Sequence, residues 1–450
     1  MSARQDYPAP AQAWWLIAVL FVAAVVSIID RGILNIVVDP VKASIGLSEV
    51  QIGVLQGLAF GIFYAIVGLP LGLGADRYSR KYLIVGGLLL WSCATIAGGF
   101  AMSFGGLFTS RILVGLGEAA LAPAAISLIA DLFPPEKRGR PISIYLMGQA
   151  VANGLAISVT GAILSASQRG AFRNLPALQT LEPWRAVFVI CGVAGLLVAA
   201  ALLTCADPRR HAAKHGAGLA LQARASASYL RENAAIFFPL YLGFAVCFMA
   251  AYGAGAWTAV MLMRGFSLTP AALAKSLGPL TIAFGILGPL LAGALIDYNA
   301  RRKAHVSKLT TLAVAPLFAV PSALAVFSHN PSLAIVLVAI IGAVMAMVGT
   351  TTISALQELV PANMRGITIA LTGILNTLLG AASGPLLVAL LTDHVFHDPK
   401  LVGYSIACVT VPALLIAAVC FAFARRALLR QLRTGGEVAL LLTDGATGSG

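Results

Sequence analysis

Long apolar runs, separated by short charged or Pro- and Gly-rich segments, occupy most of the chain. A membrane-spanning helix needs about 20 consecutive apolar residues to cross a hydrocarbon core of about 30 Å, and each of these runs is long enough. The pattern predicts twelve spanning helices, near residues 14–38, 50–75, 82–103, 106–131, 141–166, 186–205, 236–262, 274–297, 308–328, 332–358, 365–391 and 402–427. We therefore expect an all-α integral membrane protein.

The first apolar run contains two charged residues, Asp30 and Arg31, in direct succession. An Asp or Arg near the middle of a spanning helix costs roughly 2.5 to 3.5 kcal/mol on insertion scales. Such residues need partners or water, and charged groups inside a membrane generally mark functional sites. The stretch VVSIIDRGILN around them is the first candidate for the chemistry of the protein.

Composition supports a membrane protein and argues against a nucleic-acid-binding one. The 450 residues are 59% hydrophobic and 10% charged, which is far more apolar than soluble domains are. The net charge of +13 comes from short basic groups between the apolar runs, without a contiguous patch. With the N-terminus in the cytoplasm, most of the 30 Lys and Arg residues lie on the cytoplasmic side, so we expect both termini there. Short loops and the absence of a glycosylation sequon favour a bacterial inner membrane.

Two motifs occur twice, once in each half of the chain. GLGADRYSRK after the second run matches GALIDYNARRK after the eighth, and DLFPPEKRG after the fourth matches ELVPANMRG after the tenth. Two six-helix halves of the same orientation, with a substrate site between them near mid-membrane, form the parallel-repeat architecture of a large class of transporters. The predicted domains are 1–205 and 235–430, with a cytoplasmic linker at 206–234 and a disordered tail at 431–450. Within the linker, residues 219–231 fit either a short interfacial amphipathic helix or a plain connection.

The repeated motifs resemble those of the major facilitator superfamily, and the resemblance covers essentially the whole chain. A Gly, an Asp and an Arg recur at four-residue spacing, first at Gly72, Asp76 and Arg80, then at Gly293, Asp297 and Arg301. The segments IIDRGILN, SRILVGLGEAALAPA and DLFPPEKRGR are similar to the spinster-type lipid transporters. The resemblance implies the major facilitator fold of two pseudo-symmetric six-helix bundles, alternating access, and lysophospholipids or sphingoid phosphates as substrates, moved with protons or by facilitated exchange.

The resemblance also implies a conformational gate at the inner ends of the spans. An Asp at the C-terminal end of its own helix opposes the dipole of that helix, so it favours the N-terminus of a helix from the opposite half. Asp76 would lie near Arg365 at the start of the eleventh span, and Asp297 near Arg138 at the start of the fifth. Such latches would hold the outward-open state. The second motif lacks the basic residue that follows the first Asp, so its latch departs from the pattern.

A second pair of charges, Arg111 and Glu118, lies in the fourth run. The two are seven residues apart, so they share one helical face and lie about 10 Å apart along the axis. Because the first and fourth spans run in opposite directions, Asp30 reaches about the depth of Arg111. Adjacent residues on a helix point about 100° apart, so we expect Asp30 to pair with Arg111 rather than with Arg31. The sequence thus predicts a cluster of four charges in the N-terminal half.

We interpret this cluster as a proton-coupling site. A carboxylate in a low dielectric is biased towards its protonated form, and a nearby guanidinium reverses that bias. Asp30 and Glu118 would bind and release protons, while Arg31 and Arg111 hold the carboxylates or an anionic head of the substrate. The alternative is a static, neutralised network that locks the N-terminal half. The proton is the expected coupling ion, and no other cofactor is expected.

The matching positions of the C-terminal half are apolar. By the register of the repeat, Ala251 and Tyr252 take the places of the Asp–Arg pair. Tyr252 and Trp257 in the seventh span, with Thr351 in the tenth, are candidate substrate contacts on an otherwise apolar wall. An apolar wall and a charged cluster together suit an amphipathic, lipid-like substrate. The alternative is that the small apolar residues of the seventh span only pack.

Two other functions fit the sequence. One is a proton-coupled carrier of small organic anions or lipophilic drugs, and the other is a non-transporting membrane sensor, which would not need the Asp motif at both inner gates. An enzyme is least supported, since no nucleophile–base pair, metal triad or phosphate loop occurs. The segment DHVFHD at the outer end of the eleventh span fits a solvated loop better than a metal site. We expect a monomer whose partners are the bilayer and its amphipathic substrate.

Overall fold

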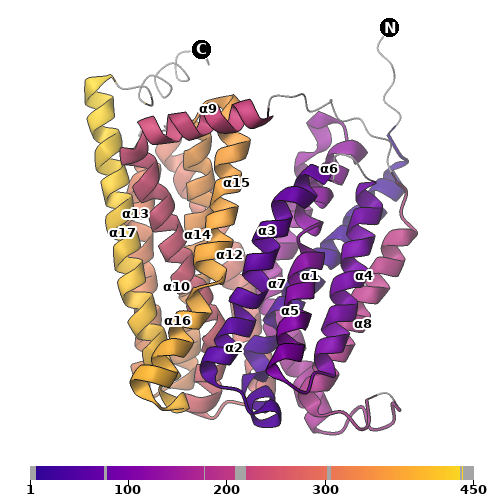
Figure 1. Ribbon diagram of the computed structural model, residues 1–450. Helices are drawn as coiled ribbons and strands as arrows, with labels where there is room; N and C mark the ends of the chain where they lie inside the picture. Colours follow the sequence, from indigo (N-terminus) through magenta and orange to yellow (C-terminus); the bar gives the residue numbers. More distant parts are fainter. Residues whose placement is uncertain are drawn as a thin grey trace. The chain divides into compact units, whose positions relative to one another are not determined.

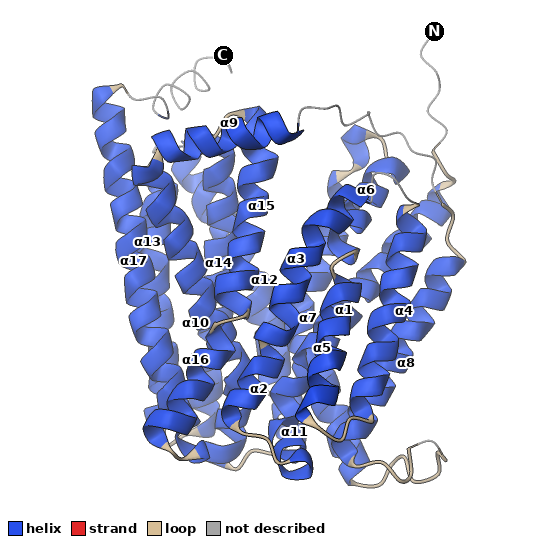
Figure 2. Cartoon of the chain, viewed as in Figure 1, coloured by secondary structure: helices blue, strands red, loops and turns tan. Residues whose placement is uncertain are grey.

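The computed structural model describes residues 7–74, 79–176, 178–207, 219–301, 306–435 and 438. Helices form nearly all of these parts of the chain (Figure 2). Within them, twelve helical stretches are long and apolar enough to cross a membrane, from Pro10–Ile45 to Pro399–Thr434. The predicted all-α class and the predicted number of spans are confirmed.

Several spans consist of one long helix (Figure 1), namely α1 (Pro10–Ile45), α4 (Arg80–Gly99), α7 (Gly139–Gln168), α8 (Pro183–Leu203), α10 (Ala234–Phe266), α14 (Pro331–Leu359) and α17 (Val402–Thr434). Others are made of two consecutive helices: α2 (Glu49–Gln56) with α3 (Leu58–Gly74), α5 (Phe104–Glu118) with α6 (Leu121–Leu132), and α11 (Pro270–Lys275) with α12 (Leu277–Arg301). The ninth span is α13 (Ser307–Ala319) continued by a 3-10 helix (Val320–Phe327). The eleventh contains α15 (Arg365–Leu375), a π-helical stretch (Asn376–Ala381) and α16 (Gly384–Leu391).

Contacts between residues divide the chain into two compact units. The first unit holds Met1–Ala213, Ala256–Ala283 and Ala389–Val402, and the second holds Lys214–Gly255, Phe284–Val388 and Gly403–Gly450. The first unit thus combines the N-terminal spans with the end of α10, all of α11, the start of α12 and the segment around the end of α16. The domain boundaries expected from the sequence remain a prediction.

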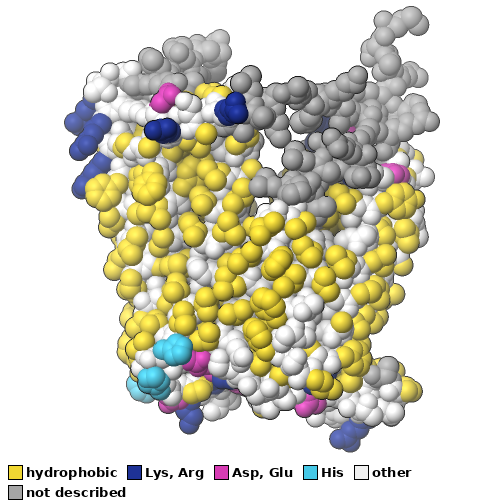
Figure 3. Space-filling model, viewed as in Figure 1, with side chains coloured by type: hydrophobic (Ala, Val, Ile, Leu, Met, Phe, Trp, Pro, Cys, Tyr) yellow, Lys and Arg dark blue, Asp and Glu magenta, His cyan; other side chains and the backbone are white. Residues whose placement is uncertain are grey.

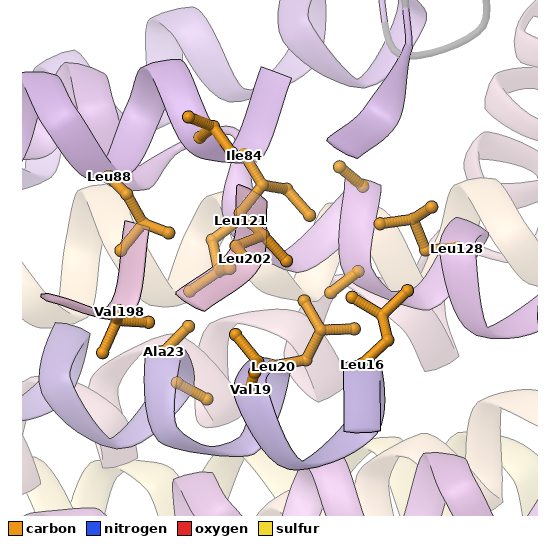
Figure 4. Close-up of a cluster of buried hydrophobic side chains, with 14 of the residues drawn as sticks. Leu16, Val19, Leu20, Ala23, Ile84, Leu88, Leu121, Leu128, Val198 and Leu202 are labelled. Carbon is orange, nitrogen blue, oxygen red and sulfur yellow. The ribbon is translucent and has the colours of Figure 1, made fainter. Parts of the chain in front are cut away.

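A buried apolar core in the first unit is built from α1, α4, α6 and α8 (Figure 4). On α1, Leu16, Leu20 and Ala23 follow helical spacing and are fully buried; on α4, Ile84 and Leu88 are one turn apart and buried as well. Because lipid tails are as apolar as leucine, close packing rather than removal from water holds such a core together. The core fixes α1 directly before its Asp–Arg pair.

Prolines explain two irregularities close to charged residues. Pro123 is the third residue of α6; it has no N–H, and its ring clashes with the carbonyl of Ala119, so the fourth span is interrupted directly after Glu118. In α1, Pro40 lies inside the helix, and Val37 just before it has non-helical angles of φ −103° and ψ 17°.

The linker contains a helix, α9 (Leu219–Glu232). Of the two alternatives for residues 219–231, a helix or a plain connection, the structure has the helix. Its Tyr229 hydroxyl donates to the Leu359 carbonyl at the end of α14 (2.8 Å). Directly after α9, the Asn233 side chain accepts a hydrogen bond from Gln431 of α17 (2.9 Å). The helix is therefore fixed to the second unit.

Candidate functional site

Glu118, at the end of α5, is the centre of a buried polar cluster in the first unit. Its Oε2 atom accepts hydrogen bonds from Arg31 Nε (2.6 Å) and Ser27 Oγ (2.7 Å), both on α1. Ser27 and Arg31 are one turn apart, so they reach the same carboxylate. The Glu118 side chain is fully buried, whereas the Arg31 side chain is 35% exposed. Arg31 therefore connects the buried carboxylate to more accessible space.

Two aromatic rings of α3 hold the guanidinium of Arg31. Its Cζ atom lies 4.5 Å from the ring centroid of Phe60 and 4.9 Å from that of Tyr64. The helix α3 approaches α5 closely because residue 115 is a glycine; a Cβ atom on Gly115 would lie 2.7 Å from the Phe60 carbonyl oxygen. Cation–π contacts of this kind contribute roughly 0.5–2 kcal/mol. The two rings therefore help to hold the guanidinium beside Glu118.

Asp30 is turned towards α4 and away from Arg31. Its side chain is fully buried, and its Oδ2 atom accepts a hydrogen bond from the Thr95 hydroxyl (3.3 Å). Its Oδ1 atom has no hydrogen-bond partner among the described residues. Buried carboxylates usually accept several hydrogen bonds, because an isolated buried charge is costly. Asp30 is therefore the less satisfied of the two carboxylates in the cluster.

Arg111 contacts Asp30, as the sequence predicts, but through the backbone. Its Nη1 atom donates to the Asp30 carbonyl oxygen (3.1 Å), and its Nη2 atom lies 3.5 Å from the carbonyl oxygen of Arg31. The carboxylate of Asp30 is turned to α4, while Arg111 comes from α5 and meets the carbonyls of α1 instead. The expected pairing of Arg111 with the Asp30 carboxylate is therefore wrong. The separation of Asp30 from its neighbour Arg31 is confirmed, and all four charges meet in one cluster.

Sequence reasoning missed four neutral side chains that complete this cluster. A signal existed for three of them, since Ser27 lies one turn before Arg31, and Phe60 and Tyr64 are one turn apart in the second span. Thr95 is one hydroxyl in an apolar run, and no spacing distinguishes it.

The first gate motif forms a buried ion pair within the first unit. Arg80, at the start of α4, pairs with Asp131, at the end of α6, and both side chains are almost fully buried. The sequence did not predict this pair, although both residues belong to repeated motifs. Arg138 donates from Nε to a carbonyl of the preceding turn (2.9 Å). Asp76 lies outside the described residues.

The second half has an equivalent pair. Lys308, at the start of α13, pairs with Glu358, at the end of α14, so in each half a cation from the third span meets an acid from the fourth. Asp297 and Arg301 at the end of α12, and Arg365 at the start of α15, are exposed. The two latches expected between the halves remain predictions.

The three candidate substrate contacts of the C-terminal half differ in accessibility. Tyr252 is 39% exposed, and its hydroxyl accepts a hydrogen bond from Asn376 Nδ2 (3.5 Å). Trp257 and Thr351 are fully buried. Of the three, Tyr252 alone offers surface to a ligand in this arrangement.

Tyr252 ends an aromatic row on α10. Phe244, Phe248 and Tyr252 follow at one-turn spacing, with successive ring centroids 4.6 and 6.4 Å apart. A Cβ atom on Gly380 would lie 3.3 Å from the Tyr252 ring, so the glycine allows close packing of the eleventh span against α10. At the exposed end of this row, Tyr252 stands at the repeat position that Arg31 takes in the first half.

A further charged cluster, which the sequence did not predict, also lies in the first unit. Arg264, near the end of α10, binds Asp39 of α1 (2.5 Å) and Glu49 at the start of α2 (2.8 Å). Lys42 binds the same Glu49 oxygen (2.5 Å), and Glu49 is fully buried. These ion pairs tie the end of α10 to the turn between the first two spans.

The DHVFHD segment is anchored rather than fully solvated. Asp393 accepts a hydrogen bond from the backbone N–H of Val50 at the N-terminus of α2 (2.8 Å), where the helix dipole favours an anion. In the described parts of the chain, no group of three or more His, Cys, Asp or Glu residues is placed to hold a metal ion.

Known proteins similar to this chain are membrane transporters. The profile of the Major Facilitator Superfamily matches residues 20–385. An MFS-type efflux pump of Mycolicibacterium smegmatis is 26% identical over 418 residues, which are 92% of this chain and 93% of the relative. A probable galactarate/D-glucarate transporter of Bacillus subtilis is 30% identical over 214 residues, 46% of this chain and 44% of the relative. The solved structure of a bacterial homologue of the human lysosomal transporter spinster, inward-facing and unoccupied, matches with a TM-score of 0.80 at 25% identity, over 94% of this chain and 99% of that one.

Proposed function

The chain belongs to the Major Facilitator Superfamily, and we propose that it carries an amphipathic, lipid-like substrate across the membrane by alternating access coupled to protons. The proposed substrate class is lysophospholipids or sphingoid phosphates. Similarity to the spinster homologue supports this class, as do the charged cluster of the first unit and the aromatic row of the second.

One observation carries the proposal: Arg31 is partly exposed and binds the buried Glu118. A proton on Glu118 neutralises its carboxylate and weakens the charge-assisted hydrogen bond from Arg31. The guanidinium, held by the rings of Phe60 and Tyr64, then offers its N–H groups to an anionic head. Loss of the proton restores the bond between Arg31 and Glu118 and displaces the head. Proton and substrate therefore favour each other's binding, which is the thermodynamic definition of coupling.

Asp30 is the second proton-binding group in this proposal. Its buried carboxyl has one hydroxyl donor, from Thr95, so any change that admits water or a cation alters the balance between its charged and neutral forms. Arg111 holds α1 against α5 through the two carbonyls and adds a positive charge nearby.

The apolar part of an amphipathic substrate needs a surface with few hydrogen-bonding groups. On α10, the partly buried Phe248 and the exposed Tyr252 offer such a surface, with the Tyr252 hydroxyl and the Asn376 amide as its polar groups. A sugar would leave hydroxyls without partners on such a surface, and each of these would cost free energy.

A second candidate function is the proton-coupled transport of small organic anions or lipophilic drugs. Similarity to the galactarate/D-glucarate transporter favours the first of these cargoes, and similarity to the efflux pump favours the second. A sugar acid would use Arg31 as a lipid head would. The two kinds of substrate differ in their apolar part. A lipid-like substrate gains about 0.8 kcal/mol of binding free energy for each methylene that it buries, and a sugar acid has no such tail.

Uptake into proteoliposomes separates these candidates. Radiolabelled lysophosphatidylglycerol, sphingosine phosphate and galactarate are offered with and without a pH gradient, and albumin removes lipid from the outer surface. We expect gradient-dependent uptake of one of the two lipids, and its loss in Arg31→Gln. Uptake of galactarate without uptake of either lipid would contradict the leading proposal.

The proposal places the protein in a bacterial inner membrane, as a monomer with both termini in the cytoplasm. A protease site fused to either terminus should be cut in inverted vesicles and protected in intact spheroplasts. Cleavage in spheroplasts would reverse the orientation without touching the proposed chemistry.

A further inference from the structure

An open groove in the second unit has no role in the transport proposal. Its volume is about 700 Å³, and it is lined by side chains of α12, α13, α14 and α17. All of these helix segments belong to the second unit, whereas the charged cluster lies in the first. The groove is therefore a separate candidate site.

The groove is polar at one end and apolar at the other. Ser307 and Thr310, in the first turn of α13, line the polar end, and Val314 and Phe318 follow one and two turns further along. From Ser307 to Phe318 the helix rises by about 16 Å. This is close to half of a hydrocarbon core of about 30 Å, so the groove extends over about one leaflet.

Its apolar walls are open to the surroundings. Val314 is 43% and Phe318 64% exposed, and Leu295 of α12 is more than one-third exposed as well. Exposed apolar side chains on a spanning helix suit contact with lipid tails, which are equally apolar. The partly buried Met347 of α14 completes this end with a flexible apolar side chain.

A cation lies at the polar end. Arg425 of α17 donates from Nε to the Thr310 hydroxyl (2.8 Å), and its two Nη atoms make no hydrogen bond to any described residue. The fixed guanidinium therefore presents two free N–H₂ groups, the geometry that binds a phosphate in a bidentate way.

The surrounding charge favours an anion. Among the described residues at this end of the four helices, six basic residues stand against two acidic ones, Asp297 and Glu358; the basic residues are Arg301, Lys308, Arg425, Arg426, Arg430 and Arg433. Glu358 is already paired with Lys308. Figure 3 shows basic side chains gathered at this end of α17, next to a broad hydrophobic surface.

We propose that this groove binds an anionic diacyl phospholipid of the surrounding bilayer, with the phosphate at Arg425 and one acyl chain along α13. The match in length, the change from polar to apolar lining and the free guanidinium edge each fit one part of that molecule. The lipid stays in its leaflet and stabilises the second unit, so it is a bound component of the transporter and not its cargo.

Native mass spectrometry tests this assignment. The full chain is released from nanodiscs that contain equal amounts of palmitoyl-oleoyl phosphatidylglycerol and the zwitterionic phosphatidylcholine with the same chains, and retained lipids are counted. We expect phosphatidylglycerol to be retained preferentially, and Arg425→Ala to lower that retention by about tenfold, since a charge-assisted bidentate contact is lost. Arg426→Ala is the matched control. It removes the same charge from the neighbouring residue, whose side chain does not line the groove.

Two further variants separate lipid binding from a structural role of Arg425. Thr310→Val removes the hydrogen bond to Arg425 but keeps the guanidinium, so phosphatidylglycerol should still be retained. Val314→Trp fills the apolar end and should lower retention, whereas Val419→Trp, at a 53% exposed position of α17 outside the groove, should not.

Equal retention by Arg425→Ala and Arg426→Ala would overturn the proposal, as would equal retention of the two lipids by the unaltered protein. Neither result depends on which substrate is transported, because the measurement contains no transport step.

Discussion

The two halves of the chain repeat one ion pair and differ in the other charged site. Arg80 with Asp131 and Lys308 with Glu358 occupy equivalent places, each joining the start of a third span to the end of a fourth. The cluster around Glu118 has no such counterpart, since Ala251 and Tyr252 stand where the first half has its Asp–Arg pair. The ion pair that joins two helices is thus repeated, and the charged cluster that we propose as the proton-coupling site is not.

The two repeated ion pairs differ in burial. Substituting the cation of the buried pair should therefore cause the largest loss of stability among the variants proposed. Arg80→Ala removes one partner of a buried ion pair, which costs about 3–5 kcal/mol. Lys308→Ala exposes a Glu358 side chain that is already half accessible, so the cost should be about 0–1 kcal/mol. Thermal unfolding in detergent measures both, with Arg80→Lys as the charge-preserving control. Equal losses would mean that the two pairs are energetically alike.

Coupling to protons should reside in the first half alone. Glu118→Gln keeps the shape and the hydrogen bonds from Ser27 and Arg31 but cannot gain or lose a proton. We expect pH-gradient-driven uptake to fall about 10- to 100-fold, because the strength of the hydrogen bond from Arg31 can no longer change with a proton on residue 118. The matched variant in the other half, Glu358→Gln, should leave this uptake unchanged. Failure of Glu118→Gln to fold would instead favour a static network.

The same substitution can be made at equivalent positions of the two repeats, so that one variant serves as the control for the other. Asp30→Asn removes a proton-binding group, and we expect the difference between uptake with and without a pH gradient to shrink by about tenfold. Ala251→Asn places the same amide at the matching site and should leave that difference intact. A normal response to the gradient in Asp30→Asn would remove Asp30 from the mechanism.

The smallest effect should come from the aromatic row. Tyr252→Phe removes only a hydroxyl whose contact with Asn376 is 3.5 Å long, so KM should change by less than about threefold. Phe248→Ala is the comparison, because it removes a ring that packs between two others. A large change in Tyr252→Phe alone would show that the hydroxyl itself binds the substrate.

Much of the fold follows from the sequence because the membrane constrains it. The length of the apolar runs, the positive loops and the two repeated motifs predicted the number of spans. The depth of the charges along antiparallel helices predicted that Arg111 and Glu118 lie next to the first span. The rotation of each helix about its axis does not follow, since a difference of one position changes direction by about 100°. For that reason Arg111 was expected on the Asp30 carboxylate, whereas it binds the backbone.

The cluster of Arg264 with Asp39 and Glu49 illustrates another limit. Arg264 and Asp39 are 225 residues apart, and each stands at the end of an apolar run, where a charge is ordinary. No spacing within one half connects them. The pair between Arg80 and Asp131 escaped notice for the opposite reason, because the motifs had already been given a role in the gate.

Glu118 lies at the point where the helix of the fourth span is interrupted. Pro123 divides the fourth span into two helices, α5 and α6, which meet directly after this acid. In the proposed mechanism, Glu118 would gain or lose its proton directly beside this interruption of the helix.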